Sequence, residues 1–407
     1  MRLFLFIRPD IRGDENMKKR IISCLLTLSM AAMLTTACGS TNDNAKATTE
    51  ENAATLGANK TETSTAELTE EEKALAAELV NRHVTQDDKV TIPVIEETIR
   101  LFKEQNTFEE GYPEIKYAAD ETGYVAEGYG WFEQMFGDAG IKVTNVQGAQ
   151  DSEEELMGRG DLTFANRMLY PFLLNIERGA DLVAVWVTAN PAKEIVSVIV
   201  AADSEYESFS DLKGKKIASS SSSCPFCVTE ELVLANGWTD GVDYEFVNTK
   251  EYVNALLAGE VDAIIYHPGT TVNPILISGQ AKVIDTALEG GVYVGGGGSR
   301  VIFTTQEIAE KYPTIVKAYL KVQELTKAYI YVDEEGAAQI NEEVSRTPAA
   351  SSIYWWDVSK ETMFSTGLSL DEVQTNTEEF YEWLTTYDKA FEGEADLSDI
   401  YDRDYIE

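Results

Sequence analysis

Histidine is scarce in this chain of 407 residues, which holds only His83 and His267. Two histidines so far apart in the sequence exclude a multi-histidine metal site, and we expect neither a metal nor a cofactor. No Gly-x-Ser-x-Gly segment is present, which excludes the nucleophile elbow of one large class of hydrolases. The sequence thus shows no constellation typical of catalysis, and we expect that the protein is not an enzyme.

Basic residues are also few, with 33 Lys and Arg against 70 Asp and Glu and a net charge of −37. So acidic a chain is repelled by nucleic acid and by anionic lipid, so neither is an expected partner. An anionic ligand is still compatible with this net charge, because a cleft can be locally positive. The 44% hydrophobic and 10% aromatic content is typical of a core-forming globular protein, and the length allows two domains.

Residues 1–37 have the pattern of a bacterial export signal. Met17 is followed by a basic run at 18–20 and then by a mostly apolar, uncharged stretch, so we expect translation to start at Met17. Residues 34–40 resemble a lipobox, with Thr in place of the usual Leu three positions before Cys38. We expect Cys38 to carry the lipid that anchors the protein. The alternative is a transmembrane anchor, for which the apolar stretch is short.

The mature chain is predicted to begin with a tether and two helices. Residues 38–68 are mostly Thr, Ala, Asn and Glu, which indicates a solvated, disordered tether. Thr69 and Glu72 form a capping-box pattern ahead of an apolar stripe, and a second helical pattern lies near 95–105. We expect the helical segment 69–110 to pack on the outside of the first domain.

From residue 114 short strand and helix patterns alternate, which predicts an α/β protein with parallel sheets. The series occurs twice, which indicates two lobes. The first is expected to comprise 111–200 together with 301–407, and the second 201–300. Residues from 301 onward read as mostly helical, and we expect them to return to the first lobe.

Several stretches resemble one family of transport proteins. Residues 209–218 read FSDLKGKKIA and are similar to the start of the second lobe in bacterial ABC-importer substrate-binding proteins. The branch is the one that binds aliphatic sulfonates, nitrate, taurine and pyrimidine precursors of thiamine. Three more segments are similar to that family: LMGRGDLTF at 156–164, LLAGEVDAI at 256–264 and EKYPTIVKAY at 310–319. The resemblance implies a two-lobed periplasmic-binding-protein fold of type 2, closing over a hinge.

The resemblance also implies a function. It is that of a monomeric lipoprotein on the outer face of the cytoplasmic membrane, which delivers a sulfonate, nitrate, taurine or a pyrimidine-like solute to an ABC permease. A lipid-anchored sensor or interaction protein on the same fold is one alternative. Another is an enzyme similar to the thiamine-pyrimidine synthases of eukaryotes, which use a cysteine-rich stretch and histidines that this chain lacks.

Strand ends supply the first candidate ligand-binding residues, because open α/β sheets bind ligands beyond the carboxyl ends of their strands. In chain order they are Tyr124, Asn166, Arg167, Trp186, Tyr266 and His267. The amide and guanidinium groups would supply hydrogen bonds and charge, and the aromatic rings could stack on a flat ligand. The alternative for each is an ordinary role in the core, at the hinge or on the surface.

A run of five serines, 219–223, lies between a predicted strand and a predicted helix over 228–236. Free N–H groups and hydroxyls at a helix start can cradle a polar or anionic group, which makes further candidates of Ser221, Ser222, Ser223 and Cys224. The alternative is a flexible linker.

Cys224 and Cys227 are the two cysteines left once the signal is removed and Cys38 is lipidated. A disulfide between them suits an extracytoplasmic protein. A redox pair with a lowered thiol pKa at a helix start, or two unreactive thiols, are the alternatives. A haem attachment site is excluded because Val228 stands where a histidine is needed.

Overall fold

The computed structural model describes residues 67–112, 114–149, 152–188, 190–269, 271–362, 364 and 368–407. The predicted signal segment 1–37, Cys38 and nearly all of the predicted tether lie outside these residues. The part from Leu68 to Glu407 forms one unit. None of its described helices combines the length and apolar character needed to cross a bilayer.

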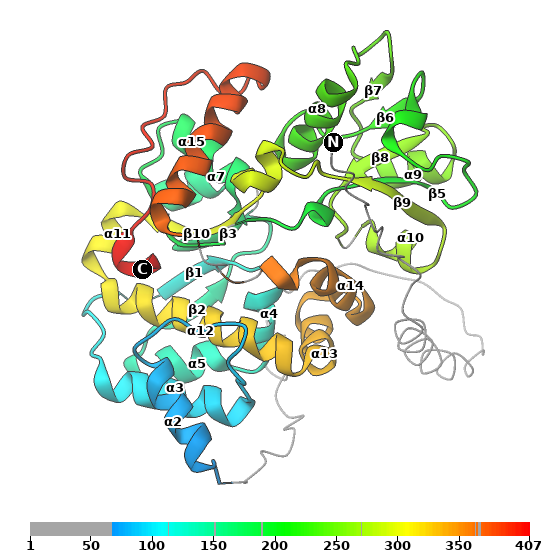
Figure 1. Ribbon diagram of the computed structural model, residues 1–407. Coiled ribbons are helices and arrows are strands. Elements are labelled where there is room, and N and C mark those ends of the chain that lie inside the picture. Colours follow the sequence, from blue (N-terminus) through cyan, green and yellow to red (C-terminus); the bar gives the residue numbers. More distant parts are fainter. Residues whose placement is uncertain are drawn as a thin grey trace, which may run out of the picture. The chain divides into compact units, whose positions relative to one another are not determined.

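The first of two five-stranded sheets has the strand order β2-β1-β3-β10-β4 (Figure 1). β10 pairs antiparallel with both β3 and β4, whereas β1 pairs parallel with β2 and β3. The sheet is therefore mixed: β1, β2 and β3 run parallel as predicted, but the strand that returns from the second sheet enters in the opposite direction. The strands are β1 (Glu114–Ala118), β2 (Lys142–Asn145), β3 (Phe164–Met168), β4 (Leu182–Val187) and β10 (Arg300–Thr305).

The second sheet repeats this plan in the order β7-β6-β8-β5-β9. Here β5 is the antiparallel strand, between β8 and β9. β5 already belongs to this sheet, so the chain changes lobe before the boundary expected between residues 200 and 201. It crosses twice, between β4 and β5 and between β9 and β10. The strands are β5 (Ser197–Ala201), β6 (Lys216–Ala218), β7 (Glu245–Val247), β8 (Ala263–Tyr266) and β9 (Ala281–Thr286).

Helices flank the strands of both sheets (Figure 1). Those before β4 are α2 (Glu70–Leu79), α3 (Ile92–Gln105), α4 (Glu121–Gly128), α5 (Trp131–Phe136), α6 (Glu153–Gly158) and α7 (Leu169–Glu177). Those of the second lobe are α8 (Ser223–Asn236), α9 (Tyr252–Leu257) and α10 (Asn273–Ile277). After β10 follow α11 (Gln306–Lys311), α12 (Pro313–Val332), α13 (Glu334–Ser345), α14 (Ala349–Ser359), α15 (Leu370–Tyr387) and α16 (Arg403–Ile406).

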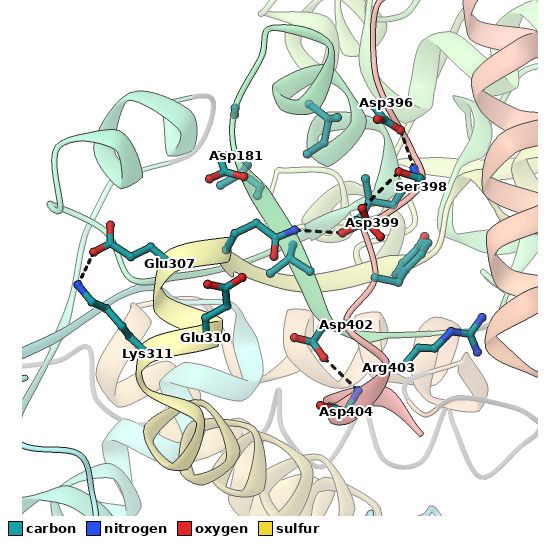
Figure 2. Close-up of a pocket in the computed structure, with 17 residues that line it drawn as sticks. Asp181, Glu307, Glu310, Lys311, Asp396, Ser398, Asp399, Asp402, Arg403 and Asp404 are labelled. Atoms are coloured by element: carbon teal, nitrogen blue, oxygen red, sulfur yellow. Dashed lines mark hydrogen bonds and ion pairs between the residues drawn. The ribbon is translucent and has the colours of Figure 1, made fainter.

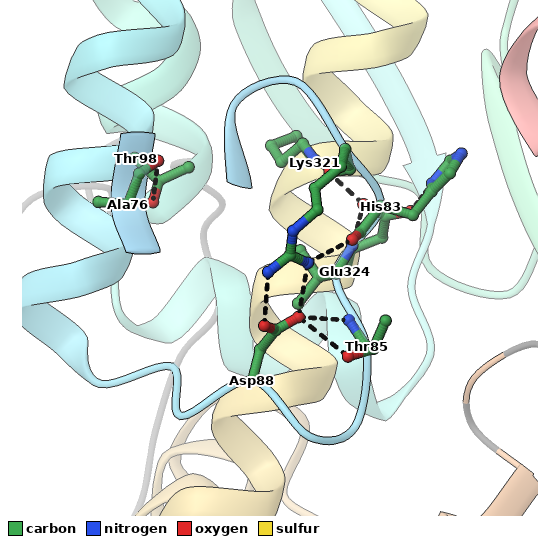
Figure 3. Close-up of polar contacts among 9 residues, drawn as sticks. Ala76, His83, Thr85, Asp88, Thr98, Lys321 and Glu324 are labelled. Carbon is green, nitrogen blue, oxygen red and sulfur yellow. Dashed lines mark hydrogen bonds and ion pairs between the residues drawn. The ribbon is translucent and has the colours of Figure 1, made fainter. Parts of the chain in front are cut away.

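The two helices ahead of β1 share a hydrophobic core with α12. α2 begins with the predicted capping box, in which Thr69 Oγ1 accepts from Glu72 N at 3.2 Å and Thr69 N donates to Glu72 Oε2 at 2.9 Å. Polar contacts then join the segment after α2 to α12, since His83 Nδ1 lies 2.5 Å from Glu324 Oε1 (Figure 3). The helical segment is thus tied to the first lobe by apolar and polar contacts.

The C-terminal part of the chain returns to the first lobe. α12 packs with α4 and α5 in the core that also contains the β1 side chains Ile115 and Tyr117. The ring of Tyr319 on α12 stacks on Phe164 of β3, with 4.1 Å between ring centroids. The stretch 301–305, predicted to be part of a mostly helical region, lies in strand β10 instead, because it pairs with strands on both sides.

Candidate ligand-binding site

A cavity of about 510 Å³ lies at the carboxyl ends of β1 and β3, where antiparallel β10 begins. This is the edge at which open α/β sheets bind ligands, and the size suits a small molecule. Both lobes and the helices after β10 line it. The charged residues of its wall are Asp120, Glu121, Arg167 and Arg300, with His267 from the second lobe.

Asp120 organises the first-lobe side of this cavity. Its Oδ1 accepts from Gly123 N at 2.9 Å, which caps α4. Its Oδ2 accepts from Asn166 Nδ2 at 2.5 Å and lies 3.4 Å from Arg300 Nη2. One carboxylate therefore orients an amide from β3 and a guanidinium from β10.

Carboxylates also balance the charge of both arginines on the cavity wall. Arg167 forms an ion pair with Glu153, whose side chain is buried. Arg300 Nη1 lies 3.9 Å from Glu121 Oε2, in addition to its contact with Asp120. The two arginines and two carboxylates of the wall leave it close to neutral, in contrast to the strongly acidic chain.

His267 is neutral in this environment. Burial, together with the nearby Arg300 and Arg167, lowers the pKa of His267 to about 4. Its Nδ1 lies 3.0 Å from the carbonyl oxygen of Ile195, which can only accept, so Nδ1 carries the proton. Nε2 of this neutral ring is consequently a hydrogen-bond acceptor.

The serine run leads directly into α8. This helix begins at Ser223, earlier than the predicted start at residue 228, so Ser223 and Cys224 belong to its first turn. Ser223 lines the cavity and has φ of +74°, a left-handed conformation that costs free energy for a residue with a side chain. The positive end of the dipole of this 14-residue helix thus lies at the cavity wall.

Five of the ten residues proposed from the sequence line the cavity, namely Tyr124, Asn166, Arg167, Ser223 and His267. The cavity lining does not include Trp186, Ser221, Ser222, Cys224 or Tyr266 among the described residues. Strand β3 also extends further than predicted, so Asn166 and Arg167 lie within the strand and not after it.

Two aromatic candidates have structural roles. Trp186 is buried in the core of the first lobe, with Lys327 Nζ 3.0 Å from its ring centroid. Tyr266 stacks on Tyr252 in the second lobe, with the ring centroids 3.6 Å apart. The Trp186 ring is thus enclosed in the core, and Tyr266 lies outside the cavity lining.

The cysteine pair forms no disulfide, which corrects one of the three alternatives. Cys224 and Cys227 are free thiols and both are fully buried in α8. Burial raises the pKa of Cys224 to about 12 and raises that of Cys227 as well, so the redox pair with a lowered pKa is also wrong. Two unreactive thiols remain.

Sequence reasoning missed Arg300, Asn273 and the residues contributed by α13 and α14. Arg300 had a local signal, because Val301–Thr305 is a run of β-branched and aromatic residues typical of a strand. Asn273 and Asn341 had no local sequence signal, since tertiary packing alone brings α10 and α13 to the cavity.

A second cavity, of about 1000 Å³, lies at the opposite edge of the first sheet (Figure 2). Asp181, at the start of β4, and Gln306, after the end of β10, line it, so it faces the amino ends of the parallel strands. Seven carboxylates and two basic side chains surround it. In the described part of the chain, no group of three or more His, Cys, Asp or Glu has an arrangement suited to a metal. Because open α/β sheets bind ligands at the carboxyl ends of their strands, the smaller cavity is the better candidate for the ligand site.

Comparison with known proteins decides the family. Residues 121–337, more than half of the chain, match the family model described as NMT1/THI5 like. The chain belongs to this family. A search of curated protein sequences finds no match.

Solved structures similar to this NMT1/THI5-like protein establish its fold. The aliphatic sulphonate binding protein SsuA from Escherichia coli has a TM-score of 0.59 and 18% identity, covering 70% of this chain and 90% of that chain. The alkanesulfonate-binding protein SsuA from Xanthomonas axonopodis pv. citri, bound to MOPS, has a TM-score of 0.55 and 17% identity, covering 69% and 96%. The two-lobed periplasmic-binding-protein fold and the family resemblance are thereby confirmed.

An enzyme shares the same fold. A DszB mutant in complex with biphenyl-2-sulfinic acid has a TM-score of 0.54 and 12% identity, covering 72% of this chain and 98% of that chain. DszB is a desulfurization enzyme. The fold therefore carries both binding proteins and a catalyst, and the site must distinguish them.

Proposed function

We propose that this protein is an extracytoplasmic solute receptor that binds a small molecule between its lobes and delivers it to an ABC permease. The observation that carries the proposal is the cavity at the carboxyl edge of the first sheet, to which both lobes contribute polar side chains. Ser223 and His267 come from the second lobe, and Asp120, Asn166 and Arg300 from the first. A ligand there would hold the lobes together, and its release would require them to separate.

The solute is proposed from the range of the family resemblance, namely a sulfonate, nitrate, taurine or a pyrimidine-like compound. Arg300, Arg167 and the start of α8 at Ser223 offer donors to an oxygen-rich group. The SsuA proteins with the same fold bind sulfonates, which supports this range.

The chain is proposed to reach its site of action as a lipoprotein. The signal pattern of 1–37 and the lipobox before Cys38 support attachment to the outer face of the cytoplasmic membrane. We propose that the protein acts there as a monomer. Cells grown with labelled palmitate should incorporate label into the wild-type protein and not into Cys38→Ser. Equal labelling of both proteins would contradict the anchor.

An enzyme is the second candidate, favoured by the fold shared with DszB. The cavity offers little to it: Cys224 and Cys227 are buried away from the lining, and Nδ1 of His267 is bound to a backbone carbonyl. Turnover of a bound sulfinate or pyrimidine, detected by mass spectrometry after long incubation, would support the enzyme over the receptor.

A thermal-shift screen tests the receptor. The full chain carrying Cys38→Ser, in a mild detergent, is heated with sulfonates, nitrate, taurine and pyrimidines. A true ligand at a hundredfold excess over its dissociation constant stabilises the native state by about 2.7 kcal/mol and raises the melting temperature. Arg300→Met should abolish that shift, whereas Arg403→Met, on α16 outside this cavity, should leave it unchanged. No shift with any compound would contradict the proposal.

A further inference from the structure

The second connection between the lobes, residues 287–299 between β9 and β10, runs beside the first connection and is joined to it at both ends. Next to the second sheet, Ala287 N donates to the carbonyl oxygen of Lys193 at 3.2 Å. Next to the first sheet, Thr188 N donates to the carbonyl oxygen of Arg300 at 2.9 Å. As long as both bonds persist, a change in the angle between the lobes has to bend the chain between them.

The first half of the second connection is attached to α8 of the second lobe. Tyr293 N donates to Glu231 Oε1 at 3.3 Å, and the same carboxylate accepts from Val292 N. Glu231 is 6% exposed, and Tyr293 is fully buried. The approach is close, because a Cβ atom on Gly291 would come within 2.6 Å of Glu231 Oε1. A buried carboxylate that binds two backbone N–H groups makes a strong attachment.

The second half of the connection packs tightly on α15, which belongs to the first lobe. A Cβ atom on Gly296 would lie 2.9 Å from Asn376 Cβ, and a Cβ atom on Gly297 would lie 2.5 Å from the ring of Phe380. α15 is itself hydrogen-bonded to α7 of the first lobe through the hydroxyl of Tyr381. Glycine is therefore required at both positions, and this half of the connection stays with the first lobe.

We infer that the lobes pivot at Val294 and Gly295, the two residues between these attachments, and that Glu231 keeps the pivot this short. A hinge needs only a few residues that absorb the change in φ and ψ, and glycine does so most easily. These residues lie in a wide helical turn, in which Gly298 N donates to the carbonyl oxygen of Tyr293, five residues back, at 2.9 Å. Such turns are rare and often mark functional positions.

Glu231 is thus a positioning residue, which acts on the candidate site through the connection and not by touching a solute. The inference rests on the proposed function, because opening of the lobes is what lets a solute enter and leave the site.

Pulsed electron paramagnetic resonance tests the pivot by measuring the distances between one spin label on each lobe. The full chain carries Cys24→Ser and Cys38→Ser and is measured without any solute. Labels are attached at Val242→Cys in the second lobe and at Glu335→Cys on α13, which packs on α4 of the first lobe; both positions are exposed. The two buried native cysteines should take no label, which the chain without the added cysteines verifies.

Glu231→Ala removes the attachment to α8 and lengthens the pivot, so the distribution of distances between the labels should widen. Glu231→Gln keeps an oxygen that accepts from Tyr293 N, so the wild-type width should be retained. Glu230→Ala removes the neighbouring carboxylate of the same helix and is the matched control, which should also retain it. Equal widths for Glu231→Ala and Glu230→Ala would overturn the inference.

Gly295→Ala tests the pivot itself. A Cβ atom on Gly295 would meet no atom within 4 Å, so the variant should fold, but alanine restricts the backbone and the distribution should narrow. Gly158→Ala, on α6, has the same open space and is the control. Equal widths for these two variants would contradict the pivot even if Glu231→Ala does not fold. Because no solute is present, either failure leaves the receptor function standing, which the thermal-shift screen tests separately.

Discussion

Asn273 Nδ2 donates to the carbonyl oxygen of Ser351 at 2.8 Å, which joins a helix of the second lobe to a helix that follows the first sheet. α10 and α14 pack against each other around this bond. Both residues also line the candidate site. The same two residues therefore join the lobes and form part of the surface that a ligand would contact.

Asn273→Ala should destabilise the protein by about 1–3 kcal/mol, because it leaves the Ser351 carbonyl without its buried donor. Urea denaturation measures the free energy of unfolding. Asn236→Ala is the control, since Asn236 Nδ2 bonds only within its own helix, to Leu232 O. Equal losses in the two variants would show that the contact between α10 and α14 adds nothing to stability.

Ser223→Gly should stabilise the protein by about 1 kcal/mol, because glycine adopts the φ of +74° found at Ser223 without a steric cost. The neighbouring Ser222 has an extended conformation, with φ of −154°, so Ser222→Gly should be neutral or destabilising. Thermal unfolding of the two variants and of wild type measures these differences in stability. A stability loss in Ser223→Gly would mean that its side chain contributes more than the backbone conformation costs.

The pairing of His83 with Glu324 makes stability depend on pH (Figure 3). The hydrogen bond to Glu324 raises the pKa of His83 above its ordinary value of 6.5. The contribution of this pair to the free energy of unfolding is therefore fully present below pH 6.5, and it is lost as the pH rises through the raised pKa. The stability advantage of wild type over His83→Asn should therefore shrink between pH 5.5 and pH 8.5. Urea denaturation at the two pH values checks this, and an advantage that stays constant or grows would contradict it.

Lys327→Met should stabilise the protein near neutral pH by about 1–3 kcal/mol, because it removes a buried polar group. Lys327 Nζ has no hydrogen-bond partner in the described part of the chain, and burial lowers its pKa to about 7. The unfolded chain thus binds more protons than the native state between pH 7 and the ordinary pKa of 10.5, so wild-type stability rises with pH.

The difference in free energy of unfolding between Lys327→Met and wild type should consequently decrease from pH 7 to pH 9, as measured by urea denaturation. Lys317→Met, at an exposed position on α12, should show no such trend. A destabilised Lys327→Met at pH 7 would mean that the contact of Lys327 with the Trp186 ring outweighs the cost of burial.

The thiols of Cys224 and Cys227 should be inert in the native protein. Burial raises the pKa of both groups, so little thiolate forms at neutral pH. In a chain with Cys24→Ser and Cys38→Ser, a thiol reagent should react at least a hundredfold faster after unfolding in guanidinium chloride. Fast reaction of the native protein would contradict the buried placement.

Short-range patterns predicted much of the fold. The capping box at Thr69 and the bounds of β4, Leu182–Val187, agree with the structure because local propensity and burial act in the same direction there. β10 was not predicted, since its place depends on pairing with β3 and β4, more than a hundred residues earlier in the chain. Strand pairing at such separation leaves no local signal of direction or order.

The candidate site was predictable where it follows a strand end or begins a helix, as at Ser223. Asn166 and Arg167 were assigned to the correct edge of the sheet, although the bounds of β3 were displaced. Trp186 was placed in the site but is buried in the core, because strand residues alternate between faces and the sequence does not say which face meets the cavity. Asn273 and Asn341 depend on helix packing between distant segments.

The position of β10 has a consequence for the order in which the chain folds during synthesis. The five strands of the second sheet all lie between Ser197 and Thr286, so that sheet can be completed from one uninterrupted stretch. The first sheet cannot, because β3 and β4 leave the ribosome well before the strand that lies between them. The lobe that is translated first is therefore the one that finishes folding last.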